Sequence, residues 1–378
     1  MFDISYLTTD SLEEGVGSSQ ILPLVIKLAE RGLKVNLLTF EKARPRLETQ
    51  DLLKKFGIFW NPREFGNRGA FAGIDRLHKI YKQMPEAKIF HARSDIPAVA
   101  ALISKRGPVL WDVRGLWSDQ KAFTENSALK RTLFKSARVL EKYSAYNSQA
   151  MSTLTRNIVP ELMARNHSLP EIRIVVPTAV DLEKFMYSET ISTPYIGLYS
   201  GTYNRYYDLP LSFAFVKEFQ RISDAEFHWA RPKESPQATL SAGESTTFIA
   251  TQSEMSTIIP NFSFGIAICN STAGPSLKGA VPTKIAEFLS CGRPVIVNRG
   301  LGDFDELLSK HKAGVIISNE TGGAKVAAKE MYELLQDPDT PMRCRQLAEA
   351  SFSLEKGVDE YMGIYQKMNL LTGDFKQY

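Results

Sequence analysis

Short apolar runs alternate with amphipathic stretches along this chain, and that alternation limits its fold more than any other feature. It predicts a strand over residues 4–7, a helix over 20–30 that Gly32 ends, and a second strand over 35–40. The pattern continues with strands over 88–90, 109–113 and 172–175 and helices over 96–105 and 127–146. Strands that alternate with helices form a parallel sheet covered by helices on both faces.

The same alternation begins again after Pro177 and predicts a second α/β domain. Its strands are expected over residues 195–199, 226–229, 264–269, 294–298 and 313–317. Residues 177–183 lack periodicity, and the charge changes sign there: 27 Lys and Arg stand against 18 Asp and Glu up to Thr178, and 19 against 24 beyond it. We therefore expect two Rossmann-like, doubly wound domains, 1–178 and 179–350, and a terminal segment 351–378 with a helix over 354–368.

Composition excludes several classes of protein. The 378 residues are 43% hydrophobic and 23% charged, as in globular domains, and no window holds the roughly 20 uncharged apolar residues of a membrane-spanning helix. The first seven residues run directly into polar ones, unlike a secretory leader. Three widely spaced cysteines, Cys269, Cys291 and Cys344, favour neither disulfides nor a zinc cluster. A cytoplasmic protein is expected.

A glycine-rich turn that contains Gly15 and Gly17 precedes the first expected helix. Its backbone N–H groups suit a phosphate or a sugar hydroxyl, and a simple helix N-cap by Ser18 or Ser19 is a compatible alternative.

The same turn also permits an NAD-dependent oxidoreductase as an alternative. A dinucleotide-binding turn would carry a third glycine where Gln20 stands and would follow the strand at once, whereas residues 8–14 intervene here. Glu41 at the end of the second strand nevertheless fits a ribose-binding acid.

Polar residues follow two further strands of the first domain, where parallel sheets bind their ligands. His91 and Arg93 are placed to orient an acceptor hydroxyl or contact a phosphate, and Arg114 offers a rigid cation beside Asp112, with Trp117 nearby. The alternatives are that Asp112 and Arg114 form a structural ion pair and that His91 only makes a structural hydrogen bond to a neighbouring residue.

The strongest motif is a helix followed by a strand over residues 282–296. Pro282 suits a helix start, so the helix N-terminus and the ammonium of Lys284 face any anion in front of them. Glu287 shares a face with Thr283 and Lys284, and its carboxylate suits the vicinal hydroxyls of a ribose. The spacing therefore indicates a nucleotide site, with a Lys284–Glu287 surface pair as the alternative.

These residues resemble a known family. Pro282-Thr283-Lys284 with Glu287, Cys291-Gly292, Pro294-Val295-Ile296 and Gly302-Asp303 looks like the donor-binding signature of glycosyltransferase family four, retaining enzymes of the GT-B fold. Other segments are similar to the family in the expected order over nearly the whole chain: Gly15 to Gln20, Asp112 to Trp117, Val176 to Asp181 with Phe185, and Tyr199 to Gly201.

The resemblance implies two Rossmann-like domains that face a central cleft, with the C-terminal helix crossing back to the first domain. It implies a UDP- or GDP-sugar as substrate and no bound cofactor. The first domain would take a glycan, lipid-linked or small-molecule acceptor, with Arg93 and Trp117 on that side. The donor would contact Gly15, Gly17, Gly201, Thr202, Thr283, Lys284 and Glu287.

The resemblance also implies the chemistry. The acceptor attacks on the face that the diphosphate leaves, so no covalent nucleophile and no metal are needed. Lys284 and Arg205, with helix N-termini, would stabilise the leaving group, and its phosphate oxygen would take the acceptor proton. His91, Asp112 and Arg114 complete the expected catalytic set.

Three positions depart from the family pattern. The family carries two glutamates eight residues apart, of which Glu287 matches the second. Gly279 stands in place of the first, so the sugar contact would come from the backbone of residues 273–280. Thr202 follows Gly201 at a position where the family carries a basic residue, and Arg114 stands where the family commonly carries a histidine. These departures motivate the main alternative, a relative that binds nucleotide sugars without turnover.

Asp303-Phe304-Asp305 mimics a metal motif of unrelated glycosyltransferases, but we expect it to cap a helix over 305–308.

The expected helix over 127–146 carries a basic face. Arg131, Lys135, Arg138 and Lys142 gather on one side, opposite Leu129, Leu133, Ala137 and Leu140, which are expected to pack inward. This face is either solvated or meets an anionic surface, such as lipid headgroups at the inner face of the membrane or a phosphorylated acceptor. Nucleic acid is not expected, because no aromatic-basic motif accompanies it.

Overall fold

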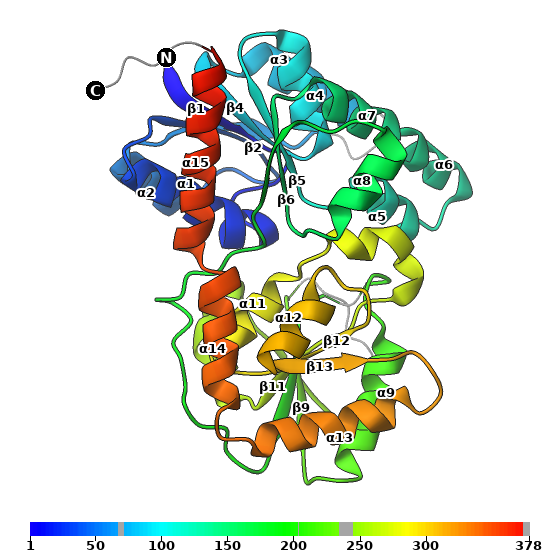
Figure 1. The fold of residues 1–378 in the computed structure, drawn as a ribbon. Coiled ribbons are helices and arrows are strands. Elements are labelled where there is room, and N and C mark those ends of the chain that lie inside the picture. The colour runs from blue at the N-terminus through cyan, green and yellow to red at the C-terminus, as the bar shows by residue number, and fades with distance from the viewer. Residues whose placement is uncertain (67–71, 203, 234–244, 373–378) are drawn as a thin grey trace. The chain divides into compact units, whose positions relative to one another are not determined.

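The computed structural model describes residues 1–66, 72–202, 204–233 and 245–372, which form two compact units (Figure 1). Unit 1 comprises Met1–Pro177 and the terminal segment from Leu354, and unit 2 comprises Thr178–Ser353. Each unit contains one parallel sheet with helices against it. The expected fold class of two Rossmann-like, doubly wound domains is confirmed.

The sheet of unit 1 has the strand order β3-β2-β1-β4-β5-β6-β7, and all neighbours are parallel. Its strands are β1 (Phe2–Leu7), β2 (Val35–Glu41), β3 (Phe59–Glu64), β4 (Ala87–Arg93), β5 (Val109–Val113), β6 (Ala150–Thr153) and β7 (Ile172–Val175). Its helices are α1 (Leu22–Glu30), α2 (Leu47–Lys55), α3 (Ala72–Gln83), α4 (Asp95–Ser104), α5 (Trp117–Thr124), α6 (Ala128–Ser136), α7 (Arg138–Asn147), α8 (Ile158–Asn166) and α15 (Leu354–Thr372), with a π-helical turn at Gly17–Ile21.

The sheet of unit 2 has the order β10-β9-β8-β11-β12-β13, again parallel throughout. Its strands are β8 (Ile196–Ser200), β9 (Glu226–Arg231), β10 (Ser245–Ile249), β11 (Phe264–Ala267), β12 (Val295–Asn298) and β13 (Gly314–Ile317). Its helices are α9 (Leu209–Gln220), α10 (Met255–Ile258), α11 (Thr283–Ser290), α12 (Phe304–His311), α13 (Gly323–Gln336) and α14 (Thr340–Ser351), with 3₁₀ segments at Gln252–Glu254, Ile259–Asn261 and Ser271–Gly279.

Strand order fixes where each unit presents a crevice. The order reverses between β1 and β4 in unit 1 and between β8 and β11 in unit 2. At such a switch point the connections leave in opposite directions and open a crevice at the carboxyl ends of the strands. Residues after β1, β4, β8 and β11 are therefore the ones to inspect for ligand contacts.

Several expected elements differ from the structure. The pattern missed β3, β6 and β10; β3 is an edge strand that contains Pro62, and β6 has only four residues. The strand expected over 88–90 continues to Arg93, so His91 lies within it.

The expected helix over 127–146 is two helices that meet at Ala137, and its apolar stripe is not packed as expected. The side chains of Leu129 and Leu133 are 83% and 46% exposed, and α6 has no buried residue. Only Leu140 of the stripe's leucines packs against the core. A helix break at Ala137 rotates the two halves relative to each other, which a single helical wheel cannot anticipate.

Close packing positions α11 over the sheet of unit 2. A Cβ atom on Gly265 of β11 would lie 2.3 Å from the ring of Phe288, so only glycine permits this approach. The helix is buried along most of its length, including Lys284 and Glu287. Its N-terminus is thereby held at the carboxyl end of the sheet.

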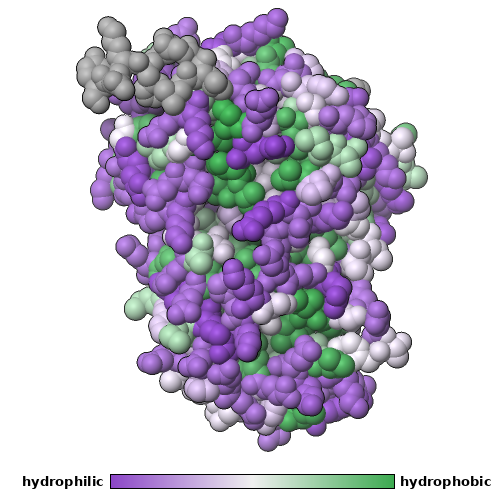
Figure 2. Space-filling model, viewed as in Figure 1, coloured by the Kyte–Doolittle hydropathy of each residue, from purple (hydrophilic) through white to green (hydrophobic). Residues whose placement is uncertain are grey.

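The C-terminal helix α15 packs on unit 1, as expected. Its inner face buries Val358, Tyr361 and Met368. On its outer side Glu355 accepts from Lys27 at 2.8 Å and pairs with Arg31 of α1's C-cap at 2.8 Å. None of the described helices is long and apolar enough to span a bilayer. Hydrophilic side chains dominate the face drawn in Figure 2, with smaller apolar groups between them.

Candidate functional site

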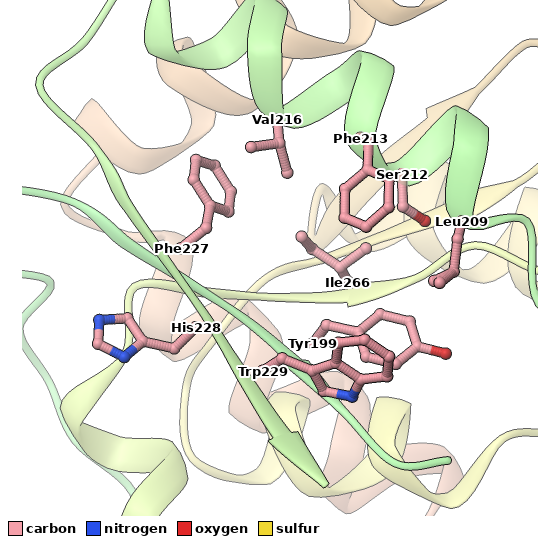
Figure 3. A pocket seen from close by; sticks show the side chains of 9 residues that line it. All are labelled: Tyr199, Leu209, Ser212, Phe213, Val216, Phe227, His228, Trp229 and Ile266. Atoms are coloured by element: carbon pink, nitrogen blue, oxygen red, sulfur yellow. The ribbon is translucent and has the colours of Figure 1, made fainter. Parts of the chain in front are cut away.

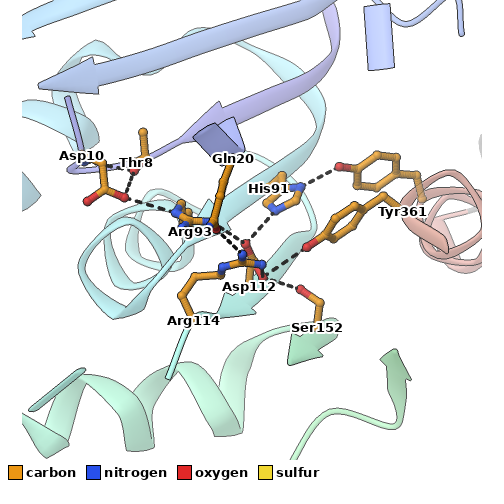
Figure 4. A network of polar contacts seen from close by, with 10 residues as sticks. Thr8, Asp10, Gln20, His91, Arg93, Asp112, Arg114, Ser152 and Tyr361 are labelled. Atoms are coloured by element: carbon orange, nitrogen blue, oxygen red, sulfur yellow. Dashed lines mark hydrogen bonds and ion pairs between the residues drawn. The ribbon is translucent and has the colours of Figure 1, made fainter. Parts of the chain in front are cut away.

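A buried polar network lies at the carboxyl ends of β1, β4 and β5 in unit 1 (Figure 4). Asp112 is its centre and is 1% exposed. Its Oδ1 accepts from Ser152 Oγ at 2.9 Å and from the Tyr361 hydroxyl at 3.3 Å, and it lies 3.5 Å from the Arg114 guanidinium. The Asp112–Arg114 ion pair, one of the two alternatives that the sequence left open, is present in the structure.

His91 is fully buried on the other side of Asp112. Its Nε2 lies 3.4 Å from Asp112 Oδ2, and its Nδ1 lies 2.6 Å from the hydroxyl of Tyr365 on α15. Burial lowers the pKa of His91, and Arg114 and Arg93 add to this against the opposing effect of Asp112, so the ring is neutral at pH 7.

The charge of Asp112 is retained despite its burial. Burial alone would raise the pKa of Asp112, but Arg114, His91 and Arg93 outweigh it and hold that pKa below its ordinary value. Asp112 accepts from Tyr361 and His91 contacts Tyr365, so the two residues together tie the C-terminal helix α15 to the sheet. The sequence did not single out Tyr361 and Tyr365 as site residues, although their spacing of four residues places both on the inner face of that helix.

Two guanidinium groups meet at the open edge of this network. Arg93 donates to Asp10 Oδ2 at 3.1 Å and to Gln20 Oε1 at 3.3 Å, and Arg114 donates to the same Gln20 oxygen at 2.8 Å. The Nε atom of Arg114 is buried without a hydrogen-bond partner among the residues described. The structure thus brings together four predicted residues, His91, Arg93, Asp112 and Arg114.

Trp117 lies apart from them. It is the first residue of α5 and packs edge-on against Phe134 of α6, with 6.0 Å between ring centroids. Its indole is also packed against the core of unit 1.

The glycine-rich turn has a packing role at Gly17. A Cβ atom there would lie 1.8 Å from the Ser11 carbonyl oxygen, so no other residue fits. Ser18 and Ser19 donate their hydroxyl protons to the Gly15 carbonyl at 3.1 and 3.0 Å. The expected N-cap is therefore wrong, because neither the π-helical turn nor α1 has a side-chain cap.

The carboxylate of Glu41 is engaged in hydrogen bonds with the segment after β1 and with its own strand, β2. Its carboxylate accepts from Ser11 Oγ at 2.6 Å, from Leu12 N at 3.0 Å and from Thr39 Oγ1 at 2.6 Å, and the residue is 4% exposed. A carboxylate engaged in this way has no oxygen turned to a ribose, which argues against the oxidoreductase alternative.

Unit 2 places Lys284 at the switch point of its sheet. Lys284 lies in the first turn of α11, is 7% exposed, and its Nζ has no hydrogen-bond partner within the described part of the chain. Burial lowers the pKa of the Lys284 ammonium to about 8. A surface pair of Lys284 and Glu287 is wrong, since Glu287 is only 6% exposed.

Gly201 follows β8 and lies directly beside that ammonium. Its φ is +118°, and a Cβ atom on it would lie 3.3 Å from Lys284 Nζ. Its carbonyl accepts from the indole N–H of Trp229 at 2.9 Å. Thr202 and Arg205 follow on the exposed side of the same segment. The structure thus brings Gly201 and Lys284 together.

The segment expected to supply backbone contacts to the sugar is the 3₁₀ segment Ser271–Gly279. Asn270 begins it and accepts from Thr272 N at 3.0 Å, and Gly274 adopts a φ of +62°. Leu277 O accepts from Gly302 N at 2.8 Å, which joins the segment to the turn before α12. Gly279 itself is buried.

The helix cap expected from Asp303-Phe304-Asp305 is wrong in detail. Asp303 stands at the N-cap of α12 without a side-chain cap bond, and Asp305 instead accepts from Gly300 N at 3.0 Å. The described residues contain no group of three or more His, Cys, Asp or Glu side chains that could hold a metal ion. The three cysteines are buried free thiols.

A small cavity lies between α9 and the sheet of unit 2 (Figure 3). Side chains of α9 face those of β8, β9 and β11 across it, with Tyr199 and Trp229 ring against ring. Its volume of about 30 Å³ leaves room for only a few water molecules. It is too small for a nucleotide.

The fold belongs to a class seen in solved glycosyltransferases. Sucrose-phosphate synthase (tll1590) from Thermosynechococcus elongatus matches with a TM-score of 0.69 at 12% identity, over 97% of this chain and 99% of its own. Anabaena Alr3699/HepE in complex with UDP and glucose matches with 0.66 at 11% identity, over 99% and 100%. WaaG, a glycosyltransferase involved in lipopolysaccharide biosynthesis, matches with 0.64 at 11% identity, over 94% and 98%.

At these identities the likeness shows the fold, two Rossmann-like domains of the GT-B type. No family model matches the chain, and a search of curated proteins finds no match either.

Proposed function

We propose that this protein is a retaining glycosyltransferase that moves a sugar from a nucleoside diphosphate sugar to an acceptor hydroxyl. The observation that carries the proposal is the Lys284 ammonium: it is buried and lacks a hydrogen-bond partner among the described residues, at the N-terminus of α11 and beside Gly201. A buried cation without such a partner is costly, and a diphosphate would satisfy it. The solved glycosyltransferases of the same fold support this reading.

The donor would lie along α11 in unit 2. Lys284 and the positive end of the helix would hold the diphosphate, with Thr283 and Thr202 beside it and Arg205 as a second cation. Glu287, one turn further along, would accept from the ribose hydroxyls. HepE was solved with UDP-glucose, which makes UDP-glucose the first donor to test, with GDP-sugars next.

The reaction would need no metal and no covalent nucleophile. As the bond between the sugar and the diphosphate breaks, negative charge grows on the phosphate oxygen, where Lys284 and the helix N-terminus stabilise it. The acceptor hydroxyl attacks the same face of the sugar and passes its proton to that oxygen. Activity should therefore persist in excess EDTA.

The acceptor would contact unit 1 near Arg93 and Arg114, beside the glycine-rich turn with Gly15 and Gly17. The two guanidinium groups share Gln20 and offer donors to hydroxyl, phosphate or carboxylate groups. His91 and Asp112 would position α15 and Arg114 through the buried network. Trp117 would act through the packing of α5.

We further propose a cytoplasmic protein whose α6 contacts an anionic membrane. Leu129 and Leu133 are exposed on the same short helix as Arg131 and Lys135, a combination that suits the interface of an anionic bilayer. Arg138 and Lys142 extend the basic face onto α7, although Arg138 forms an ion pair with Asp119 of α5.

Vesicle sedimentation tests this contact. Wild type should sediment with anionic vesicles at low salt, the combined Arg131→Glu and Lys135→Glu variant should not, and Leu129→Ser should weaken binding at all salt concentrations. Equal sedimentation of all three proteins would refute it.

The rival function is a protein that binds nucleotide sugars without turnover, motivated by Gly279 and Thr202 at positions where the family carries functional side chains. A panel of UDP- and GDP-sugars decides between the two. Release of UDP or GDP, by transfer or by hydrolysis, supports the enzyme, whereas tight binding without release supports the rival.

A further inference from the structure

The ammonium of Lys284 lies in a corner formed by two tyrosine rings. Its Nζ is 4.3 Å from the ring centroid of Tyr199 and 4.2 Å from that of Tyr207. The rings are nearly perpendicular, at 82°, with 5.8 Å between their centroids. Both distances are within the range in which a cation is attracted to the face of an aromatic ring.

Each ring is held in place from behind. Trp229 packs against Tyr199 at 82° with 5.4 Å between centroids, and its indole N–H is fixed by the Gly201 carbonyl. Tyr207 forms an antiparallel bridge with Cys269, and the next residue, Asp208, donates its N–H to Ile268 O at 3.0 Å. Figure 3 shows Tyr199 and Trp229 below the side chains of α9. The corner is thus rigid.

Ring faces and hydrogen-bond acceptors hold an ammonium in different ways. A carboxylate or carbonyl would engage its N–H donors, whereas a π face attracts the charge and leaves those donors for a ligand. Among the described residues, the ionisable groups that face Lys284 are Cys269, beyond β11, Glu287, on its own helix, and the two tyrosines. Burial raises the pKa of the Cys269 thiol to about 12, so Cys269 is neutral and supplies no counter-charge.

We propose that Tyr199 and Tyr207 are positioning residues, which hold the Lys284 ammonium beside Gly201 and aim its N–H donors at the diphosphate of the donor. By orienting the ammonium, the two rings compensate in part for the basic residue of the family pattern, in whose place Thr202 stands. This inference rests on the proposed function for the identity of the ligand, but the contact between rings and ammonium stands on its own geometry.

Tyr207 is the better residue to change, because it is only partly buried whereas Tyr199 is 6% exposed. Tyr207→Phe retains the ring face and Tyr207→Leu removes it, so the pair separates the ring from the hydroxyl. The first readout is UDP affinity by isothermal titration between pH 6 and 9.5.

Wild type and Tyr207→Phe should lose UDP affinity over the same pH range as Lys284 deprotonates. Tyr207→Leu should lose it at a pH at least half a unit lower and bind UDP about fivefold to tenfold more weakly at pH 8. An unchanged profile in Tyr207→Leu would overturn the proposal.

The second readout needs no nucleotide. Lys284→Met is made in the wild-type and in the Tyr207→Leu background, and the two changes in Tm are compared. If the ring stabilises the ammonium, Lys284→Met raises Tm more when the ring is absent; equal increments overturn the contact. Should neither UDP nor GDP bind wild type, the proposed function fails, and this comparison still decides whether the ring holds the ammonium.

Discussion

Replacement of Lys284 by methionine should stabilise the protein while it weakens nucleotide binding. Methionine fills a similar unbranched space without a charge. The ammonium is 7% exposed, lacks a hydrogen-bond partner among the described residues and has a pKa of about 8 instead of 10.5. A lowered pKa means that the folded state binds this proton less tightly than the unfolded state does. The charge therefore costs stability below pH 8, and the cost disappears as pH rises from 8 to 10.5.

The magnitude follows from that difference. At about 1.4 kcal/mol for each pH unit, the fall to about 8 corresponds to ~3 kcal/mol. A gain of up to ~3 kcal/mol at pH 7 should raise the Tm of a domain this size by up to about 12 °C.

Thermal unfolding at pH 7 and pH 10 measures the effect, with Lys310→Met, on the exposed side of α12, as the control. Lys284→Met should raise Tm at pH 7 and have little effect at pH 10, and it should weaken UDP binding by about 10- to 100-fold. A Tm that falls at pH 7, or a gain that is the same at both pH values, would refute the reasoning that the ammonium is strained without its ligand.

Other variants test neighbouring parts of the site and the fold. Glu287→Ala should weaken UDP binding by ~1.5–3 kcal/mol in isothermal titration with the fold retained, and an unchanged affinity would remove the ribose contact. Gly201→Ala should cost ~1–2 kcal/mol of stability and also weaken UDP binding, since its Cβ would crowd Lys284 at 3.3 Å; Gly300→Ala, with positive φ but nothing within 4 Å, should show the stability cost alone. Asp95 is 4% exposed, and burial, with Glu141 adding to it, raises its pKa to about 7, so its charge costs stability as pH rises from about 4 to 7. Asp95→Asn, which can still accept from Trp111, should raise Tm at pH 8 and not at pH 4.5; an equal change at both would contradict this.

The sequence predicts much of the fold because periodicity reports burial directly. The strands 35–40, 109–113 and 172–175 match β2, β5 and β7 closely, since each is an unbroken apolar run or nearly so. Edge strands such as β3 and β10 have half-exposed, mixed sequences and give no such signal. The break between α6 and α7 at Ala137 carries no glycine or proline that would mark it in the sequence.

The site was predictable where one segment carries it and not where distant segments meet. Lys284 and Glu287 stand out because one turn of one helix contains both. The contacts of Lys284 with the rings of Tyr199 and Tyr207 and the contact of Tyr361 with Asp112 join residues far apart in the chain. No spacing rule connects such pairs, and an aromatic residue at a strand end is ordinarily assigned to the core.

Turnover of nucleotide sugars is the decisive measurement for the proposed glycosyltransferase activity. Wild type and Lys284→Met are incubated with a panel of UDP- and GDP-sugars, and the nucleoside diphosphate released is measured with and without EDTA. Wild type should release the nucleoside diphosphate from at least one donor, insensitive to EDTA, and Lys284→Met should do so at a rate at least tenfold lower. Absence of release from every donor, with UDP or GDP still bound tightly at the Lys284 site, would contradict the claim that this protein is a glycosyltransferase.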